Sequence, residues 1–392
     1  MNRKHKALTV LLVAVLLFFS ACGIRNILDP LGTGDDDAFN PLSMNSIREP
    51  DMIDFTVSRL LYDGLTETQK QAYRRIYNTV AAHPAKILIP SLSEKELSAV
   101  FLALKFDNPH ILCLQNTYTY YNASSKFYIL PEYNDTEANC EKMTAELLSA
   151  AREICSGIPQ EADEYEKELY LHDKLIELVS YDTGKNSDTA YGALVLHKAA
   201  CGGYALACKL LFDMAGIQSV TVCGTAAGTD GGYVPHMWLA ASINEQWCFV
   251  DPAWDDPVTS THADTVRHTY FNVDTKTLSL THAAFTLPQN IVCDFTGNDF
   301  YTRSGLLLKE NTWQKLLADH LAAVSSLPVH FEFRCGSGEL FTELYEKLFD
   351  NGGLNDFVQT LIEKFGNISV SHSIDEDRDV LHLYIRTETE DQ

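Results

Sequence analysis

In the first half of the chain, some stretches have apolar residues at the spacing of helices and others have the composition of strands. Three stretches repeat apolar residues every three or four positions, as amphipathic helices do. Ser93 and Glu96 form a capping box at the start of the second stretch. Two shorter runs, joined by a polar turn, have the composition of paired strands. We therefore predict an N-terminal α+β region at residues 50–158, with helices at 66–80, from Ser93 onward and at 136–155, and strands at 116–121 and 126–130.

The middle of the chain predicts two helices and an antiparallel sheet. Residues 163–179 have an apolar helical face that includes His172, so we expect this histidine to be a hydrogen-bonded core residue. A second amphipathic stretch begins at Cys201. In a hairpin that turns at Asn244 and Glu245, positions whose numbers sum to about 489 face each other, which brings His236 beside Asp251. The predicted strands are 218–224, a strand from His236 to about 243, and 246–251.

Residues 301–392 predict a separate small α+β domain. An apolar helical face starts at Trp313, and a strand, two helices and a hairpin follow before a polar tail at 387–392. The region contains no catalytic constellation, so binding or spacing is its expected role. Its predicted strand is 329–334, its helices are 340–348 and 354–365, and its hairpin is 368–373 with 380–386.

The first 21 residues predict a secretory signal peptide. Three basic residues precede an apolar run at 7–19, and the small pair Ser20 and Ala21 stands directly before Cys22. The run is shorter than the about 20 apolar residues of a membrane span. A cysteine at this place is typical of the bacterial lipobox, although Phe19 stands where leucine is usual, which leaves ordinary cleavage or an uncleaved anchor as alternatives. We predict a cell-surface lipoprotein outside the cytoplasm, anchored in the membrane lipid by acyl chains such as palmitate on Cys22, with residues 22–49 as a flexible tether.

The charge balance excludes one class of partner. The 392 residues include 30 basic and 53 acidic side chains, a net charge of −23 that becomes −26 without the signal peptide. A surface of this sign, without a basic stripe, repels nucleic acid and anionic lipid head groups. We therefore expect no nucleic-acid partner.

Cysteine and histidine spacing points to thiol chemistry rather than to a metal. Besides Cys22 there are nine cysteines, an odd number, so one of them can be a free nucleophile. Disulfides are permitted in the predicted compartment, but spacing assigns no pair. His262, His268 and His282 have no acidic or cysteine partner at metal-ligand spacing, so we expect no metal site and no cofactor.

Cys201 has the local setting of a reactive thiol. The free N–H groups and positive end of a helix favour the thiolate and can donate to an oxyanion. Gly202 and Gly203 are expected to keep the space around the sulfur open. On this motif alone a buried cysteine at a helix start is an equally good interpretation. Together with His236 to move protons and Asp251 to orient the imidazole, however, Cys201 completes the set needed for nucleophilic acyl transfer.

Three sequence blocks in this order resemble the transglutaminase-like superfamily, the papain-related group with Cys-Gly-Tyr, His-x-Trp and Asp-Pro-x-Trp motifs. Here the blocks are 201–204, 236–238 and 251–254, and upstream Tyr181-Asp182 and 191–194 also resemble the bacterial branch. The resemblance implies an α+β core at 159–300, in which the helix with Cys201 packs on an antiparallel sheet with His236 and Asp251. It also implies that Cys201 is the nucleophile, His236 the general base and then acid, and Asp251 the orienting carboxylate.

Departures from the family pattern concern the pocket and not the triad. Met237 and Leu239 replace the Ala and Asn of His-Ala-Trp-Asn, and Gly203 stands where a polar residue is frequent. Tyr191 is a candidate second oxyanion donor, and Cys208 is expected in the core. Trp238 and Trp254 are expected to be packing residues more often than substrate platforms. The candidate pocket residues are Tyr191, Gly202, Gly203, Tyr204, Trp238 and Trp254.

These features predict a membrane-tethered, extracytoplasmic cysteine hydrolase or acyltransferase that acts on peptide amides through a thioester at Cys201. A peptidase or amidase acting on cell-wall or surface peptides is favoured over a cross-linking transglutaminase. Cross-linking needs a site that prefers an amine to water, and the sequence shows no such site. The alternative is a non-catalytic surface binding or scaffold lipoprotein that retains the transglutaminase-like fold.

Overall fold

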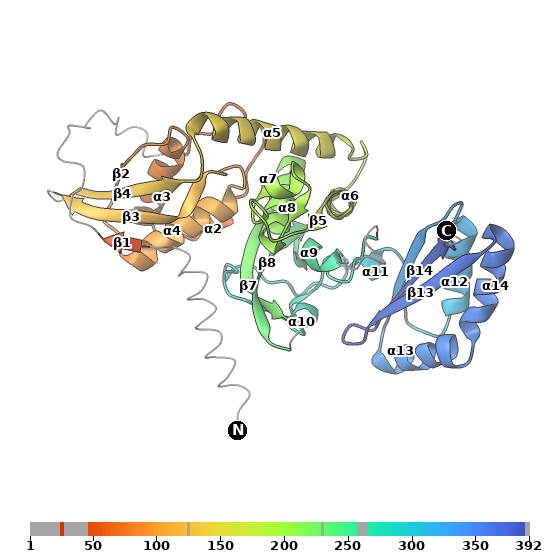
Figure 1. Cartoon of the computed structure of the whole chain (residues 1–392). Coiled ribbons are helices and arrows are strands. Elements are labelled where there is room, and N and C mark those ends of the chain that lie inside the picture. Colours follow the sequence, from red (N-terminus) through yellow and green to blue (C-terminus); the bar gives the residue numbers. More distant parts are fainter. Residues whose placement is uncertain (1–23, 27–45, 124–125, 229–230, 257–264, 389–392) are drawn as a thin grey trace, which may run out of the picture.

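The computed structural model describes residues 24–26, 46–123, 126–228, 231–256 and 265–388. In this part of the chain three four-stranded sheets follow one another along the sequence, each accompanied by helices (Figure 1). The predicted α+β class is confirmed. The predicted signal peptide, Cys22 and His262 lie outside the described residues. None of the described helices is both long and apolar enough to cross a membrane.

The first sheet has the strand order β1-β3-β4-β2 and packs on two capped helices. The capping box at Ser93 is confirmed, and Thr66 with Gln69 forms a second one before the preceding helix. One prediction is wrong: residues 22–49 are not all tether, because 24–26 pair in parallel with 118–120. The elements are β1 (Ile24–Asn26), α2 (Leu60–Asp63), α3 (Glu67–Val80), β2 (Ile87–Ile89), α4 (Glu94–Asp107), β3 (Leu114–Ala123) and β4 (Lys126–Tyr133).

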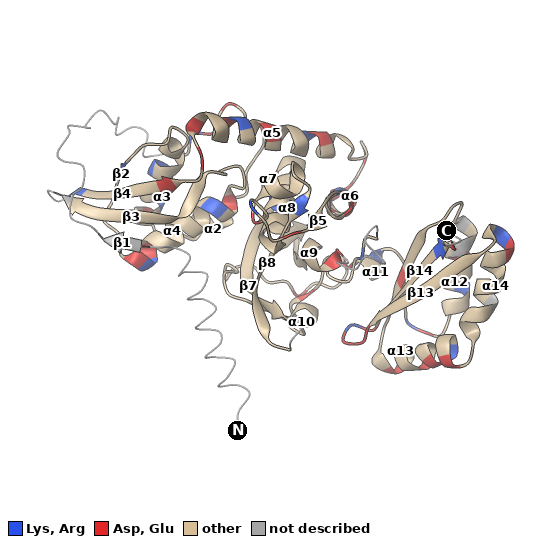
Figure 2. Cartoon of the chain, in the orientation of Figure 1, with Lys and Arg blue, Asp and Glu red and all other residues tan. Residues whose placement is uncertain are grey.

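A long helix, α5 (Glu137–Ser156), links this sheet to the central part of the chain. At its start Cys140 forms a disulfide with Cys113, a pair that spacing did not assign. Further along, Leu147, Leu148 and Ala151 join the hydrophobic core around α8. Both acidic and basic positions lie along this helix (Figure 2). α5 therefore packs with the central core as well as with the N-terminal region in which the sequence placed it.

The central sheet has the order β10-β7-β8-β9, and its strands are antiparallel. One face packs on α8 (Cys201–Ala215), whose buried side is almost entirely apolar. The opposite face forms a second core around Trp238 and Phe249. The predicted hairpin register is confirmed, because Leu239 pairs with Val250 and Ile243 with Gln246. The strands are β7 (Ser219–Ala227), β8 (Tyr233–Ile243), β9 (Gln246–Val250) and β10 (His282–Ala284).

Short elements surround the central sheet and position the residues before α8 and after β9. The two-stranded parallel pair β5–β6 ends two residues before Cys201. A short helix that the sequence analysis missed, α9, follows Asp251 directly. These elements are α6 (Glu164–Leu178), β5 (Ser180–Tyr181), α7 (Ala190–Leu194), β6 (Lys198–Ala199), α9 (Pro252–Asp255), α10 (Thr275–Leu278) and α11 (Phe300–Arg303).

The C-terminal sheet has the order β11-β12-β14-β13 and its own hydrophobic core. The predicted strand, helices and hairpin are present. The helix predicted at 340–348 consists of an α-helix that continues into a π-helical turn at Glu346–Asp350. The elements are β11 (Leu307–Leu308), α12 (Trp313–Ala323), β12 (Val329–Cys335), α13 (Gly338–Tyr345), η2 (Glu346–Asp350), α14 (Gly353–Phe365), β13 (Ile368–Asp375) and β14 (Val380–Thr387).

Candidate active site

Cys201 is the first residue of α8, and it is partly exposed while the helix behind it is buried. The preceding residue, Ala200, is extended and provides no side-chain cap. N–H groups in the first helical turn have no acceptor within the helix and form its positive end. The sulfur of Cys201 therefore stands where backbone donors can stabilise negative charge.

The two glycines after Cys201 allow close packing of the helix start. The prediction that they keep the space around the sulfur open is wrong. Both Gly202 and Gly203 are buried. A Cβ on Gly203 would lie 2.2 Å from the carbonyl oxygen of Ser187, and one on Gly202 would lie 3.1 Å from Asp188 Oδ1. The absence of side chains lets the start of α8 lie directly against residues 187–189.

His236 lies on β8 beside Asp251 at the end of β9, as the hairpin register predicts. His236 Nε2 is 2.6 Å from Asp251 Oδ2, and both side chains are almost fully buried. Since Nε2 is engaged by the carboxylate, Nδ1 is the ring nitrogen left for Cys201, which is one of the neighbours that raise the pKa of His236. The structure thus brings the three predicted residues together in the order thiol, imidazole, carboxylate.

The charges of its neighbours set the protonation of His236. Burial alone lowers its pKa, but the negative charge of Asp251 and the hydrogen bonds to Asp251 and Cys201 outweigh burial and raise it to about 10. Asp251 is affected in the opposite way: burial raises its pKa, yet His236 and His282 lower it well below the usual range. At neutral pH the site therefore holds a carboxylate and an imidazolium.

Asp251 is fixed by three hydrogen bonds. Its side chain caps α9, because Oδ1 accepts the backbone N–H of Trp254 at 3.2 Å. Oδ2 accepts from His236 and, at 3.1 Å, from Nε2 of His282. An Asp before a Pro at a helix start is a capping signal that could have revealed α9 from the sequence.

His282 is a site residue that the sequence analysis missed. It lies on β10, is fully buried, and its Nδ1 is 2.8 Å from Thr281 Oγ1. Thr281 Oγ1 in turn accepts a hydrogen bond of 2.8 Å from Arg378, in the turn between β13 and β14. Thr281 therefore donates its proton to His282 Nδ1, which leaves the Nε2 proton of His282 directed at Asp251. A hydrogen-bond chain thus connects the C-terminal sheet to the triad carboxylate.

Replacing His282 with phenylalanine should lower kcat/KM by about 10- to 100-fold, because Asp251 loses a donor and the imidazole of His236 loses a fixed orientation. Steady-state kinetics on an activated amide or ester will measure the change. His320→Phe, at an exposed histidine on α12, is the control and should leave kcat/KM unchanged. A folded His282→Phe protein with unaltered kinetics would show that Asp251 needs only its other two donors.

The candidate pocket residues divide into buried and accessible groups. Tyr204 and Trp238 are fully buried, so their assignment to a substrate pocket is wrong and Trp238 is a packing residue, as preferred above. The hydroxyl of Tyr204 donates to Asp256, and Tyr191 donates to Glu146 on α5. Trp254 is partly exposed and its ring lies 5.9 Å from that of His236.

Tyr181 lies closer to the chemistry than the sequence indicated. Its side chain is 44% exposed, and its pKa is raised first by burial and then by the negative charges of Cys201, Asp188 and Asp251. Tyr181 pairs with Ala199 across β5 and β6, two residues before Cys201. The only earlier signal was the Tyr181-Asp182 pair, which resembles the bacterial branch of the family. Cys208, by contrast, is fully buried, as expected.

One cavity lies away from Cys201, in the N-terminal region. It has a volume of about 370 Å³ and is lined by the Cys113–Cys140 pair together with Tyr77 and His110. None of the triad residues lines it. The reactive groups and this cavity are therefore separate features.

His268 and His282 were predicted to have no acidic partner because none stands at metal-ligand spacing in the sequence. The folded chain brings acidic side chains to both, so this prediction is wrong. His282 contacts Asp251, and His268 lies between Asp173 and Glu332. His172 is buried and hydrogen-bonded as expected, but its partners are the carboxylates Asp173 and Asp255. Sequence spacing could not show these pairs, because most of the partners are 31 to 95 residues apart.

Comparisons with known proteins agree with the motif resemblance. Residues 148–252 match the model of the transglutaminase-like superfamily, which confirms that resemblance for this part of the chain. No curated protein sequence matches. The solved structures found include a TGase at 14% identity and a TM-score of 0.26, covering 35% of this chain and 44% of that one.

Two further solved structures are similar at the same level. A proposed cysteine protease from Cytophaga hutchinsonii is 13% identical with a TM-score of 0.25, covering 46% of this chain and 78% of that one. The periplasmic domain of TgpA from Pseudomonas aeruginosa, bound to ethylmercury, is 19% identical with a TM-score of 0.21, covering 33% and 55%. At such values the three proteins say nothing about the activity of this chain, which spans less than half of the TGase.

Proposed function

We propose that the protein is a cysteine hydrolase or acyltransferase that acts on peptide amides, since residues 148–252 match the model of the transglutaminase-like superfamily. The observation that supports this most directly is the arrangement of the three residues: His236 and Asp251 form a buried hydrogen bond of 2.6 Å, and Cys201 presents a partly exposed thiol at the start of α8. The signal-like first 21 residues support an extracytoplasmic location, with Cys22 as the lipid anchor. Peptides of the cell wall or cell surface are then the substrates within reach.

The proposed reaction begins with attack of the Cys201 thiolate on the amide carbonyl carbon. The oxyanion that forms accepts hydrogen bonds from backbone N–H groups at the start of α8. His236, protonated at rest, donates its proton to the leaving amine as the C–N bond breaks, and a thioester remains on Cys201. Water then attacks the thioester, His236 accepts a proton from it, and the carboxylic acid leaves with the thiolate restored.

Hydrolysis is favoured over cross-linking within this class. Transamidation requires that an amine reach the thioester while water does not. Cys201 is partly exposed, and Tyr181, which pairs with Ala199 two residues before it, is 44% exposed, so water has access to this side of the site. A peptidase or amidase accordingly fits the described residues better than a cross-linking enzyme.

Alkylation by iodoacetamide tests the proposal without knowledge of the substrate. Cys201 should react faster than every other thiol of the purified protein at neutral pH, because it is paired with a protonated His236. His236→Ala should slow its alkylation by about 10-fold or more. Peptide mass spectrometry of time points gives the rate constant at each cysteine.

Two variants make the alkylation experiment specific. Cys201→Ser should remove the fast phase, which assigns that phase to Cys201. His372→Ala, at an exposed histidine that stacks on Phe349 in the C-terminal domain, should leave the rate unchanged. Slow alkylation of Cys201 in both the parent and His236→Ala would contradict the proposal and favour a tethered binding protein.

A further inference from the structure

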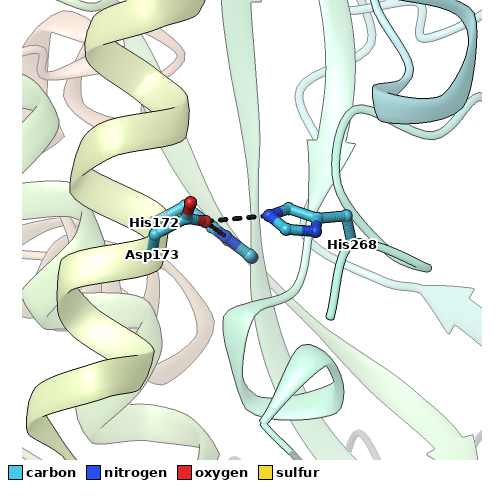
Figure 3. A group of neighbouring side chains, drawn as sticks. All are labelled: His172, Asp173 and His268. Carbon is cyan, nitrogen blue, oxygen red and sulfur yellow. Dashed lines mark hydrogen bonds and ion pairs between the residues drawn. The ribbon is translucent and has the colours of Figure 1, made fainter. Parts of the chain in front are cut away.

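His172, Asp173 and His268 converge on a single point between α6 and the segment that precedes α10 (Figure 3). His172 and Asp173 are consecutive on α6, and His268 approaches from the opposite side. His172 Nδ1 lies 3.0 Å and His268 Nε2 lies 2.9 Å from the same oxygen, Asp173 Oδ1. The two imidazole nitrogens and the carboxylate oxygen therefore lie within 4.8 Å of one another.

The far side of each imidazole is held by a buried carboxylate. His172 Nε2 is 3.2 Å from Asp255, and His268 Nδ1 is 2.5 Å from Glu332. These carboxylates are anchored in turn, because Asp255 accepts the N–H of Tyr270 and Glu332 accepts the hydroxyl of Tyr301. Metal-binding histidines characteristically donate their second N–H to a carboxylate, which fixes the ring and increases its basicity.

One side of this group of three residues is accessible to solvent. The side chain of His172 is fully buried and that of His268 is 10% exposed, whereas that of Asp173 is 31% exposed. An ion can therefore enter along Asp173 and keep a water molecule on the exposed side. Two histidines, one carboxylate and a water form a four-coordinate set that suits zinc.

We propose that His172 Nδ1, an Asp173 carboxylate oxygen and His268 Nε2 bind one divalent transition-metal ion, with Zn²⁺ as the ion that the ligand set fits best. A tetrahedral zinc site has ligand atoms about 3.3 Å apart, from metal–ligand bonds of about 2.0–2.1 Å. The observed 2.9–3.0 Å separations need to widen by only a few tenths of an ångström. Zinc is preferred to Mg²⁺ or Ca²⁺ because imidazole nitrogen is a poor ligand for those ions.

Two other histidine–carboxylate groups are weaker candidates. The group of His236, Asp251 and His282 contains two of the three proposed catalytic residues, so it already has a role in the proposed reaction. In the group of His330, Glu332 and His382, the two imidazoles hydrogen-bond each other at 3.1 Å. Only the proposed site has a carboxylate behind both of its imidazoles.

The position of the site indicates a structural role for the metal. It joins α6 to the His268 segment, and Glu332 on β12 extends the connection to the C-terminal sheet. Asp255 belongs to α9, the helix that Asp251 caps. A bound ion would thus stabilise α9 through Asp255, and with it the helix start that Asp251 caps.

Metal binding to the purified full chain tests the inference. After dialysis against Zn²⁺ and then metal-free buffer, elemental analysis should find one zinc per chain. Asp173→Asn and His268→Gln should each weaken zinc binding by about 10-fold or more in competition with a chromogenic chelator. His330→Gln, on the same strand as Glu332 but outside the proposed ligands, should leave the affinity unchanged.

Cobalt substitution separates this site from the thiol of Cys201, which is itself able to bind zinc with His236. Co²⁺ at His172, Asp173 and His268 should show visible d–d bands without thiolate-to-cobalt charge transfer, and Cys201→Ala should retain the metal. If His268→Gln does not fold, Asp173→Asn provides the test, because the Asp173 side chain is partly exposed. Absence of stoichiometric metal, its retention in both ligand variants, or its loss in Cys201→Ala would overturn the inference and leave a metal-free network of hydrogen bonds.

Discussion

Cys201→Ala is expected to abolish turnover of peptide amides, with kcat reduced by at least about 10³-fold. The thioester requires the sulfur, and no other described side chain beside His236 can replace it as a nucleophile of comparable strength. A chromogenic peptide anilide or an activated ester will report the rate. Mass spectrometry of the parent protein mixed with the ester should also show a transient acyl adduct on the peptide that contains Cys201.

Cys155→Ala is the matched control for this substitution. Cys155 on α5 is also partly exposed, but burial raises its pKa to about 11 and its sulfur contacts the carbonyl of Leu211. Its removal should leave kcat within about twofold of the parent, as for an unreactive thiol. Equal losses in the two variants would mean that the assay reports folding, and an active Cys201→Ala would refute the triad.

Lys209→Met is expected to destabilise the protein by about 3–5 kcal/mol, the usual cost of removing one partner of a buried ion pair. Lys209 and Asp213 lie on α8, are both fully buried, and are 2.5 Å apart. The variant leaves the carboxylate of Asp213 without its counter-ion beside Asp107, another fully buried acid. Urea denaturation followed by tryptophan fluorescence will measure the free energy of unfolding.

The chain offers an exposed pair of the same spacing as a control. Lys315 and Asp319 on α12 are also four residues apart and 2.5 Å from each other, but both are mostly exposed. Lys315→Met should change the free energy of unfolding by less than about 0.5 kcal/mol. A similar loss in both variants would show that burial does not set the strength of the Lys209–Asp213 pair.

The cost of Lys209→Met should also depend on pH. Burial raises the pKa of Asp107 to about 7, and it also raises that of Asp213. A raised carboxyl pKa favours the folded state below the unfolded pKa of about 4, and this contribution is lost as the pH rises through about 7. The variant should therefore lose less stability at about pH 5, where the acids can be neutral, than at about pH 8.

Short-range signals determined a large part of the fold. The Ser93–Glu96 capping box depends on residues three apart, and it starts a helix where predicted. Asn244 and Glu245 both adopt positive φ, the backbone geometry of a tight hairpin turn. That turn sets the strand register, and the register brings His236 to Asp251. Such features follow from the sequence because neighbouring residues alone supply the geometry.

Long-range contacts decided what surrounds the triad. His282 reaches Asp251 only because β10 pairs with β7, and Arg378 reaches Thr281 across 97 residues of chain. The Cys113–Cys140 disulfide likewise depends on how the end of the first sheet meets the start of α5. No local pattern specifies such pairs, because they result from packing among whole elements.

The amino-acid sequence by itself identified Cys201, His236 and Asp251 as the candidate nucleophile, base and orienting acid, since each lies in a motif whose spacing and turn chemistry fix its local placement. Only the tertiary structure decided that Gly203 closes a packing contact, that Tyr204 and Trp238 are buried, and that His268 meets Asp173. Burial and the meeting of distant side chains depend on the sum of many weak contacts across the fold. The sequence pattern predicts where each helix or strand ends and which of its faces is apolar. Which of those faces contact each other is decided only when the elements pack together.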